Sequence, residues 1–299
     1  MPDLAPIVLF VYNRPLHTKH TVQALQKNIL ASQSEIFIYS DGAKNDNQRE
    51  SVKAVREYIK EIEGFKKITV IERHTNFGLA NSIIDGVTKI VNEFGKVIVL
   101  EDDLVTSPYF LAYMNDGLKL YENDKNIASI HGYIFPIDNL PETFFIRGTD
   151  CWGWATWKRA WNIFEPNGKV LLEKLKSRKL QKEADLDGCY HYTKMLEDQI
   201  IGKNNSWAIR WYMSAFLEDM LTLYPGKSYV ENIGNDGSGT HSIATKVFSP
   251  VLITQYTRLT KLNMVENSYC RRQIAQFLSS MNRNIFFYTN HLSIVRPRD

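Results

Sequence analysis

Short apolar runs and longer amphipathic segments alternate along the first hundred residues. The runs are rich in β-branched and aromatic residues and predict four strands: Ile7 to Tyr12, Glu35 to Tyr39, Ile68 to Ile71, and Val97 to Leu100. The segments between them have apolar residues at helical spacing and predict three helices: His17 to Leu30, Gln48 to Ile62, and Leu79 to Phe94. This alternation indicates an α/β, Rossmann-like fold with a mostly parallel central sheet flanked by helices.

The pattern is less regular after residue 105. A helix is predicted to begin near Ser107-Pro108, where the serine would cap it. Further strands are predicted at Ile127 to Ile130 and at Leu221 to Tyr224, while residues 170 to 205 are charged and helical in pattern. The tryptophans fall at spacings of three and four, which predicts that they share one buried face of a helix: Trp154, Trp157 and Trp161.

Composition narrows the class of protein. The chain has 299 residues, of which 44% are hydrophobic and 12% aromatic, so intrinsic disorder and low-complexity architectures are excluded. A formal net charge of +3 is too small for nucleic-acid binding across the whole surface, and no nucleic-acid partner is expected. The three cysteines stand far apart and give neither a disulfide framework nor a zinc motif. With no apparent signal peptide or membrane span, we expect a cytoplasmic location.

Polar residues follow each of the first four predicted strands. They are Asn13-Arg14-Pro15, Asp41-Gly42, Arg73-His74 and Glu101-Asp102-Asp103. Any one of these is also ordinary turn chemistry. Since open α/β sheets bind ligands at the carboxyl ends of their strands, the four together predict a ligand-binding edge.

The acidic triplet Glu101-Asp102-Asp103 directly follows a buried strand, where three carboxylates are costly unless a cation compensates them. Mg²⁺ and Mn²⁺ suit carboxylate oxygens and often bind substrate phosphates as well. The alternative is a solvated acidic loop or an anion cluster at a helix N-terminus. The triplet therefore makes this edge a candidate metal site.

Residues 97 to 120 join the triplet and Leu104 to a helix that starts with Ser-Pro-Tyr-Phe. This stretch resembles the nucleotide-sugar-binding region of GT-A-fold glycosyltransferases, with N-acetylglucosaminyltransferase I and its bacterial relatives as the nearest likeness. Other stretches agree: Tyr12 to Pro15, Asn76 to Ala80, and Thr149 to Trp154. The resemblance covers residues 5 to 165 well and the chain up to His241 more loosely. It implies a GT-A-like domain over residues 1–249.

A basic helical extension is expected over residues 250–299. From Pro250 onward the sequence has seven Lys and Arg residues and two acidic residues, which gives a net charge of +5. Interleaved apolar residues predict helices that lie against the main domain. A solvated basic face and peripheral contact with an anionic membrane, such as the inner face of the cell membrane, are both open interpretations.

The resemblance assigns roles to residues of the predicted edge. It implies that Asp103 binds the metal, and that Glu101 and Asp102 contact the metal's water shell, the ribose or the donor sugar. The nucleotide would be bound by Asn13 and Arg14 near its phosphates and ribose, and by Asp41 and His74 near its base. Trp152 and the adjacent Gly153 would lie beside the donor sugar and the acceptor, although core packing of Trp152 is the alternative.

A loop dense in turn residues ends at His241, and Gly234 to His241 is expected to close over the donor diphosphate. His241 would complete the metal shell or bind the diphosphate.

Inverting glycosyl transfer also needs a carboxylate that deprotonates the acceptor hydroxyl. In the resembled enzyme an aspartate precedes a tryptophan, but here that place reads Asn204-Asn205-Ser206-Trp207. Asp198 is the first candidate for the base; the others are Asp150, Glu197 and Asp219.

The sequence thus predicts a metal-dependent inverting glycosyltransferase that uses Mn²⁺ or Mg²⁺. It would move a hexosyl or N-acetylhexosaminyl group from a nucleoside diphosphate sugar, with a UDP-sugar favoured, to a hydroxyl of a carbohydrate or lipid-linked glycan. The expected role is the synthesis of a bacterial surface polysaccharide or another glycan. A nucleotidyltransferase acting on sugar phosphates is one alternative, but it would usually have a glycine-rich loop after the first strand. A non-catalytic carbohydrate-binding protein is the other, and it leaves the triplet unused.

Overall fold

The computed structural model describes residues 4–236, 245–256 and 258–292. An eight-stranded sheet forms its centre. One half holds four parallel strands in the order β3-β2-β1-β4, with bounds β1 (Ile7–Val11), β2 (Glu35–Ser40), β3 (Lys67–Glu72) and β4 (Lys96–Glu101). These are the strands that the apolar runs predict. Every residue of β1 is buried, as expected of a strand covered by helices on both faces.

The other half of the sheet continues from β4 in the order β8-β6-β9-β7. Its strands are β6 (Ile127–His131), β7 (Thr143–Arg147), β8 (Trp154–Trp157) and β9 (Leu221–Pro225). β8 runs antiparallel to both β4 and β6, and β7 is antiparallel to β9, while β6 and β9 are parallel. Four of the seven pairings are thus parallel, which confirms the mostly parallel sheet. A separate two-stranded ribbon pairs β5 (Leu104–Thr106) with β10 (Val230–Asn232).

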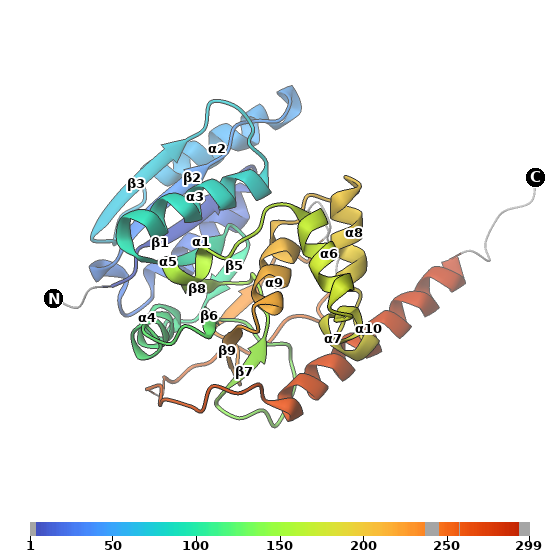
Figure 1. Cartoon of the computed structure of the whole chain (residues 1–299). Coiled ribbons are helices and arrows are strands. Elements are labelled where there is room, and N and C mark those ends of the chain that lie inside the picture. The colour runs from blue at the N-terminus through green and yellow to red at the C-terminus, as the bar shows by residue number, and fades with distance from the viewer. Residues whose placement is uncertain (1–3, 237–244, 257, 293–299) are drawn as a thin grey trace, which may run out of the picture.

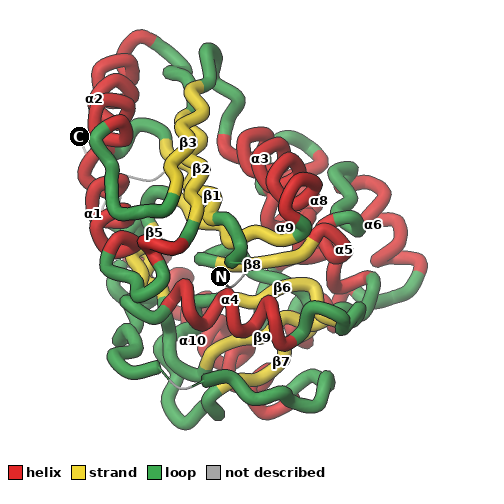
Figure 2. The backbone as a smooth tube through the Cα atoms, turned by 90° about the vertical axis from the view of Figure 1, so that its left-hand side faces the viewer, coloured by secondary structure: helices red, strands yellow, loops and turns green. Residues whose placement is uncertain are grey.

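Helices cover both faces of the sheet. α1 (Pro15–Gln26) and α2 (Arg49–Lys60) lie on one side of β1, β2 and β3, and α3 (Leu79–Phe94) lies on the other (Figure 2). α4 (Phe110–Leu120) packs on β6 and β8, and α9 (Trp207–Leu217) packs near α3. The remaining short elements are η1 (Ala31–Gln33), η2 (Asp46–Gln48), α5 (Lys158–Trp161), α6 (Gly168–Ser177), α7 (Gln181–Ala184), η3 (Leu186–Gly188) and α8 (Tyr192–Ile200). The first helix predicted after β5 begins at Phe110, slightly later than expected.

The prediction of one helix carrying three tryptophans is wrong. Trp154 and Trp157 belong to β8, and only Trp161 lies on a helix, α5. Trp154 stacks on Trp207 of α9 with ring centroids 5.5 Å apart, whereas the Trp157 indole donates a hydrogen bond to the Leu118 carbonyl of α4 at 3.1 Å. The two side chains therefore point to opposite faces, as an odd separation on a strand requires. The buried location of all three was predicted correctly.

The C-terminal helix α10 (Ser268–Leu292) begins against the sheet and projects away from the body (Figure 1). Its first turns bury Cys270, Ile274 and Leu278 in a cluster with Phe144 of β7 and Tyr224 of β9. The Asn267 amide also donates to the Phe145 carbonyl at 2.8 Å. The start of the extension is therefore packed on the main domain, and the division at residue 249 stays a prediction.

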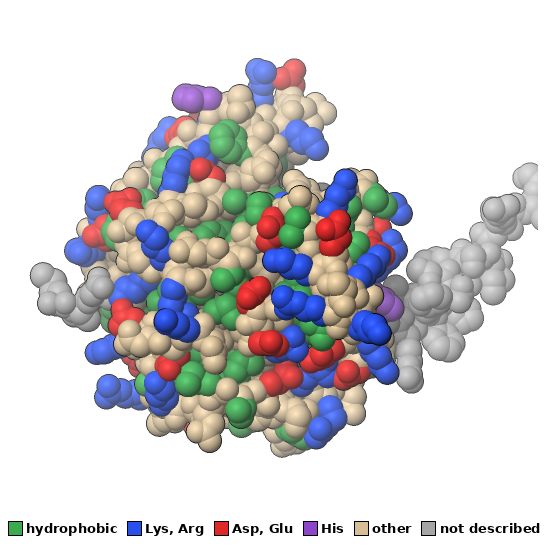
Figure 3. Space-filling view, in the orientation of Figure 1, with side chains coloured by type: hydrophobic (Ala, Val, Ile, Leu, Met, Phe, Trp, Pro, Cys, Tyr) green, Lys and Arg blue, Asp and Glu red, His purple; other side chains and the backbone are tan. Residues whose placement is uncertain are grey.

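The surface mixes charges of both signs. On the face that Figure 3 shows, Lys and Arg side chains are interspersed with Asp and Glu, in keeping with the small net charge of +3. Within the described ranges, none of the helices combines the length and the hydropathy that crossing a membrane requires.

Candidate active site

The sheet brings the polar ends of β1 and β4 together. Phe10 of β1 is in register with Glu101 of β4, so Arg14 and the acidic triplet leave the sheet at the same edge. The Arg14 Nη2 atom lies 2.9 Å from Asp103 Oδ2 and also donates to Asp102 Oδ1. Asn13 is half-buried in the same turn. The structure therefore brings Arg14 and the acidic triplet together, as the sequence predicts.

Asp102 is held in place from several directions. It is 4% exposed, its Oδ2 accepts from the Tyr12 amide at 3.3 Å, and its carbonyl accepts from Thr21 Oγ1 at 2.8 Å. Burial raises the pKa of Asp102 to about 6, although the Arg14 charge opposes this rise. These contacts suit a carboxylate that positions Arg14 and β1.

Negative charge exceeds positive charge at the triplet. Burial raises the pKa of Glu101, and the charges of Asp103 and Asp102 raise it further. Burial alone would lower the pKa of Arg14, but Asp102 and Asp103 outweigh burial and raise it. One guanidinium thus stands against three carboxylates, and a divalent cation would compensate the remaining charge.

Gly234 packs directly on Asp103. A Cβ at this glycine would lie 2.2 Å from Asp103 Oδ2, and the neighbouring Ile233 amide donates to the Asp103 carbonyl at 2.9 Å. The β5–β10 pairing brings this turn to the triplet, and His17 Nε2 of α1 lies 3.1 Å from Asp236 Oδ2. The start of the predicted closing loop is therefore at the site, while His241 lies outside the described residues.

The donor set at the triplet fits a metal that the substrate helps to hold. Asp103 is a carboxylate with a 14% exposed side chain. Mg²⁺ is commonly held by one or two carboxylates together with substrate phosphates, so a complete protein cage is not required. In the part of the chain that the structure describes, no cluster of three or more His, Cys, Asp or Glu side chains is arranged to hold a metal ion. Asp103 as a ligand stays a prediction.

Asp41 organises the loop before α3. It is 7% exposed, and its oxygens accept from the Gly42, Phe77 and Gly78 amides at 2.8–2.9 Å and from Asn76 Nδ2 at 3.1 Å. Each carboxylate oxygen thus accepts two N–H groups. This geometry supports a loop-positioning role, and direct contact of Asp41 with the base stays a prediction.

We expect Asp41→Asn to loosen this loop, because the new amide group directs its own hydrogens at N–H donors. Leaving such groups unpaired costs about 1–3 kcal/mol of unfolding free energy. The KM for the donor should rise while kcat at saturating donor is largely retained. Calorimetry and donor titrations measure both effects, with the exposed Asp46→Asn as control. A large fall in kcat at unchanged KM would contradict the expectation.

A partly exposed aromatic ring lies beside Asp41, because the Phe77 amide donates to Asp41 Oδ1. The Phe77 side chain is 39% exposed, and the Arg73 guanidinium carbon lies 4.4 Å from its ring centroid. His74 is exposed on the same loop. Phe77 has no role predicted from the sequence. The signal that could have singled it out is an aromatic residue directly before the glycine of this loop.

Trp152 and Gly153 lie where the chain enters β8. The Trp152 ring packs edge-on to Tyr133 with centroids 4.6 Å apart, so the core-packing alternative is realised in part. Gly153 has a φ of +69°, and a Cβ there would lie 2.7 Å from the Val230 side chain. A glycine is needed for this close approach. Contact of Trp152 with a sugar stays a prediction.

Asp150 lies in this entry loop, next to Cys151, whose amide donates to Asp150 Oδ1 at 2.7 Å. Burial and the charges of Asp150, Glu101 and Asp103 raise the pKa of the Cys151 thiol, which places it among all three carboxylates. Val99 of β4 pairs with Trp154 of β8, and Asp103 and Asp150 each lie four residues beyond that pair at the same end of the ladder. The Asp150 side chain is 27% exposed.

The other candidate bases form ion pairs with lysine or arginine side chains. A hydrogen bond from Lys194 and the charge of Lys203 lower the pKa of Asp198. Glu197 pairs with Lys176 at 3.2 Å, and the 79% exposed Asp219 pairs with Arg147 at 2.7 Å. The Asn204 to Trp207 segment caps α9, where Ser206 Oγ accepts from the Ile209 amide at 3.2 Å. These ion pairs favour Asp150 over Asp198 as the base.

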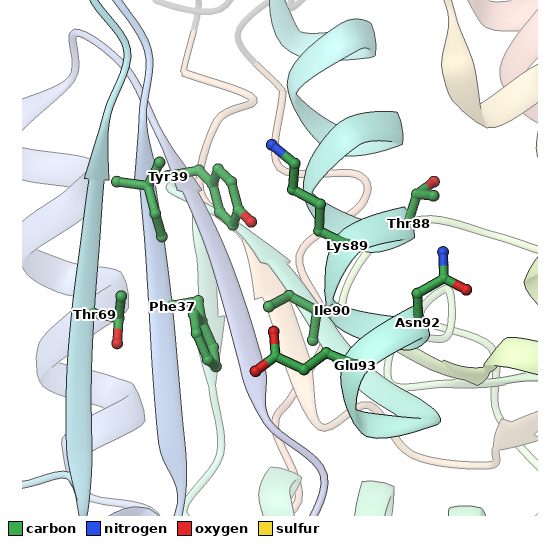
Figure 4. A pocket seen from close by; sticks show the side chains of 9 residues that line it. Phe37, Tyr39, Thr69, Thr88, Lys89, Ile90, Asn92 and Glu93 are labelled. Carbon is green, nitrogen blue, oxygen red and sulfur yellow. The ribbon is translucent and has the colours of Figure 1, made fainter.

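A cavity of about 490 Å³ lies between β2, β3 and α3. Phe37 and Tyr39 point into it from the sheet, and Lys89 and Glu93 border it from α3 (Figure 4). Its lining includes none of the residues that the sequence assigned to a site. We therefore place the candidate active site at the triplet.

Comparisons with known proteins find a matching family model and similar solved structures. The model of glycosyl transferase family 2 matches residues 7–191. Among solved structures, the chain is similar to S. aureus TarS 1–349 in complex with UDP, with 11% identity, a TM-score of 0.41, and coverage of 76% of this chain and 59% of that one. It is also similar to the mannosyltransferase PcManGT from Pyrobaculum calidifontis in complex with GDP-Man and Mn²⁺, with 14% identity, a TM-score of 0.34, and coverage of 58% and 50%. The chain thus spans about half to three fifths of these proteins. A comparison with curated proteins finds no match.

Proposed function

Because this chain belongs to glycosyl transferase family 2, we propose that it is a metal-dependent, inverting glycosyltransferase that uses a nucleoside diphosphate sugar. The family assignment confirms the resemblance to GT-A-fold glycosyltransferases and the nucleotide-sugar transferase class. It favours sugar transfer over both nucleotidyl transfer and non-catalytic carbohydrate binding. The observation that carries the proposal is the acidic triplet at the end of β4, with which Arg14 is the one cation that forms ion pairs in the described part of the chain.

Asp103 is the proposed metal ligand, and Asp102 and Arg14 hold it in position. A bound Mn²⁺ or Mg²⁺ would stabilise the negative charge that the diphosphate leaving group gains. Arg14 would add a second positive group beside that diphosphate. A UDP-sugar is the favoured donor, with its base next to Phe77 and the loop that Asp41 orders.

Asp150 is the proposed general base. It stands beyond the end of the β4–β8 ladder, as Asp103 does, so an acceptor between them would face both the base and the donor carbon. A carboxylate that takes the acceptor proton directly allows a single displacement, which inverts the configuration of the sugar carbon. Asp198 has lower basicity because Lys194 and Lys203 stabilise its charged form.

The proposed acceptor is a hydroxyl of a carbohydrate or lipid-linked glycan, in bacterial surface polysaccharide or other glycan synthesis, and the transferred group is a hexosyl or N-acetylhexosaminyl unit. Membrane contact through the basic segment is a further part of this proposal, with the protein at the inner face of the membrane. Two of its cations are already paired, Lys261 with Asp124 at 2.9 Å and Arg271 with Asp187. Electrostatic attraction to a membrane would thus depend on the rest, such as Arg258 and Arg272.

Thermal unfolding with UDP, GDP or ADP, each with and without Mn²⁺, tests the donor site. One of these nucleotides, with UDP favoured, should raise the midpoint only when Mn²⁺ is present. A ligand at a hundred times its Kd adds about 2.7 kcal/mol of stability. Addition of EDTA should abolish the increase. A midpoint that none of the nucleotides raises, with either Mn²⁺ or Mg²⁺, would contradict the proposed function.

A further inference from the structure

His131 is a fully buried imidazole at the carboxyl end of β6. It is 0% exposed, and among the residues that the structure describes neither of its ring nitrogens has a hydrogen-bond partner. Its Nε2 atom lies 3.7 Å from Asp150 Oδ2. Buried polar groups are nearly always paired, so this ring and the adjacent Asp150 carboxylate are a pair to explain.

The sheet fixes this imidazole behind Asp150. His131 is in register with Trp154 of β8, and the adjacent strand β9 places the Tyr224 ring 4.9 Å from the imidazole. Burial and the neighbouring Asp150 charge raise the pKa of Tyr224, and Asp150 Oδ1 accepts from the Cys151 amide at 2.7 Å. Asp150 Oδ1 is thus anchored, and Oδ2 faces His131.

A carboxylate that acts alone as a base has a limitation. An ordinary Asp has a pKa near 3.9, well below that of an imidazole, near 6.5. A neighbouring imidazole therefore offers a second acceptor for the proton taken from the acceptor hydroxyl; burial lowers the pKa of His131, and the Asp150 charge opposes this lowering.

We propose that His131 is a positioning and proton-accepting residue for Asp150, an inference that rests on the proposed function. As the acceptor oxygen bonds to the sugar carbon, the bond from that carbon to the diphosphate breaks and its electron pair leaves with the diphosphate. The acceptor proton passes to Asp150 Oδ2 and from there to Nε2 of neutral His131. After product release, the imidazolium returns the proton through Asp150 to solvent.

The neighbouring titratable groups add no charge next to His131 and Asp150 at pH 7. The titratable groups that face it are Tyr133, Cys151, Tyr190, Tyr192 and Tyr224, and burial raises the pKa of each, so they are neutral at pH 7. Burial lowers the pKa of His131, and the Asp150 charge partly offsets this. The resting pair is thus a neutral imidazole beside a carboxylate, and the charges of Glu101 and Asp103 act on the adjacent Cys151.

Kinetics of His131→Gln test the relay, because glutamine retains polarity but cannot accept the proton. We expect kcat to fall about 10²-fold, the lower end for general acid–base catalysis, with the donor KM unchanged. The acid limb of the kcat/KM profile should move to lower pH, because only the Asp150 carboxylate then has to remain ionised. Ser129→Ala on the same strand is the control: it removes the 2.8 Å hydrogen bond to Thr222 and should lower stability without moving the limb. An unmoved limb, or an unchanged kcat, overturns the proposal.

NMR titration of His131 provides a test that is independent of turnover and of the His131→Gln variant's folding. In Asp150→Asn the pKa of His131 should fall relative to wild type, because the carboxylate that stabilises the imidazolium is absent. An equal pKa in both proteins overturns the proposed pair. If the proposed function itself were wrong, the wild type would show neither transfer nor stabilisation by a nucleotide with Mn²⁺, whereas the His131–Asp150 coupling would persist.

Discussion

Asp103→Asn is expected to abolish sugar transfer while the chain stays folded. A catalytic metal supplies several kcal/mol of charge stabilisation, and each 1.4 kcal/mol changes the rate tenfold, so kcat should fall by about 10³ or more. Folding should change little, because the loss of one Arg14 contact is offset by reduced repulsion from Glu101 and Asp102. Single-turnover transfer assays and calorimetry measure the two quantities.

The control for Asp103→Asn is a comparison of nucleotide binding with and without added Mn²⁺. In the variant, added Mn²⁺ should no longer increase the stabilisation by nucleoside diphosphate, whereas in the wild type it should. Turnover within tenfold of the wild type would rule out Asp103 as the metal ligand.

Asp150→Asn has the second largest expected effect. Asparagine keeps the size of the side chain and an oxygen for the Cys151 amide, but it cannot take the acceptor proton. Removal of a general base should lower kcat by about 10²- to 10⁴-fold, with little change in the donor KM. Transfer assays at saturating donor and acceptor measure this loss.

Asp198→Asn is the comparison variant, because it removes the base favoured by sequence alone. Its turnover should stay near the wild-type value, since Asp198 is tied to Lys194 and Lys203 on the surface of α8. The opposite result, with Asp198→Asn inactive and Asp150→Asn active, would identify Asp198 as the base.

The parallel half of the sheet was predictable because its strands carry their own signal. Buried parallel strands such as β1 and β4 read as continuous apolar runs, and their ends can be located to within a residue or two. The acids after β4 could be found for the same reason. β10, by contrast, has three residues and exists because β5 pairs with it, a contact that no local pattern records.

Asp150 stood behind Asp198 with Glu197 and Asp219 on sequence grounds, and the sequence did not identify β8 as a strand. Over the eight residues from Trp154 to Trp161, spacings of three and four fit a helix as well as a strand followed by a single helical turn. If a helix followed it in place of β8, Asp150 would have no defined position relative to β4. His131 also gave no signal, because it closes an apolar run in which a histidine looks like the end of a buried strand.

Because β8 is antiparallel, the segment that precedes it lies at the edge where β4 ends. The separation of the proposed base from the proposed metal ligand is thus set by the hydrogen-bond register of Val99 with Trp154, and only secondarily by the two short loops. A slip of this ladder by two residues preserves which face each side chain occupies, yet it displaces one carboxylate along the other strand by roughly 7 Å. The spacing of the proposed base from the proposed metal ligand is therefore constrained by the sheet as well as by the loops that carry them.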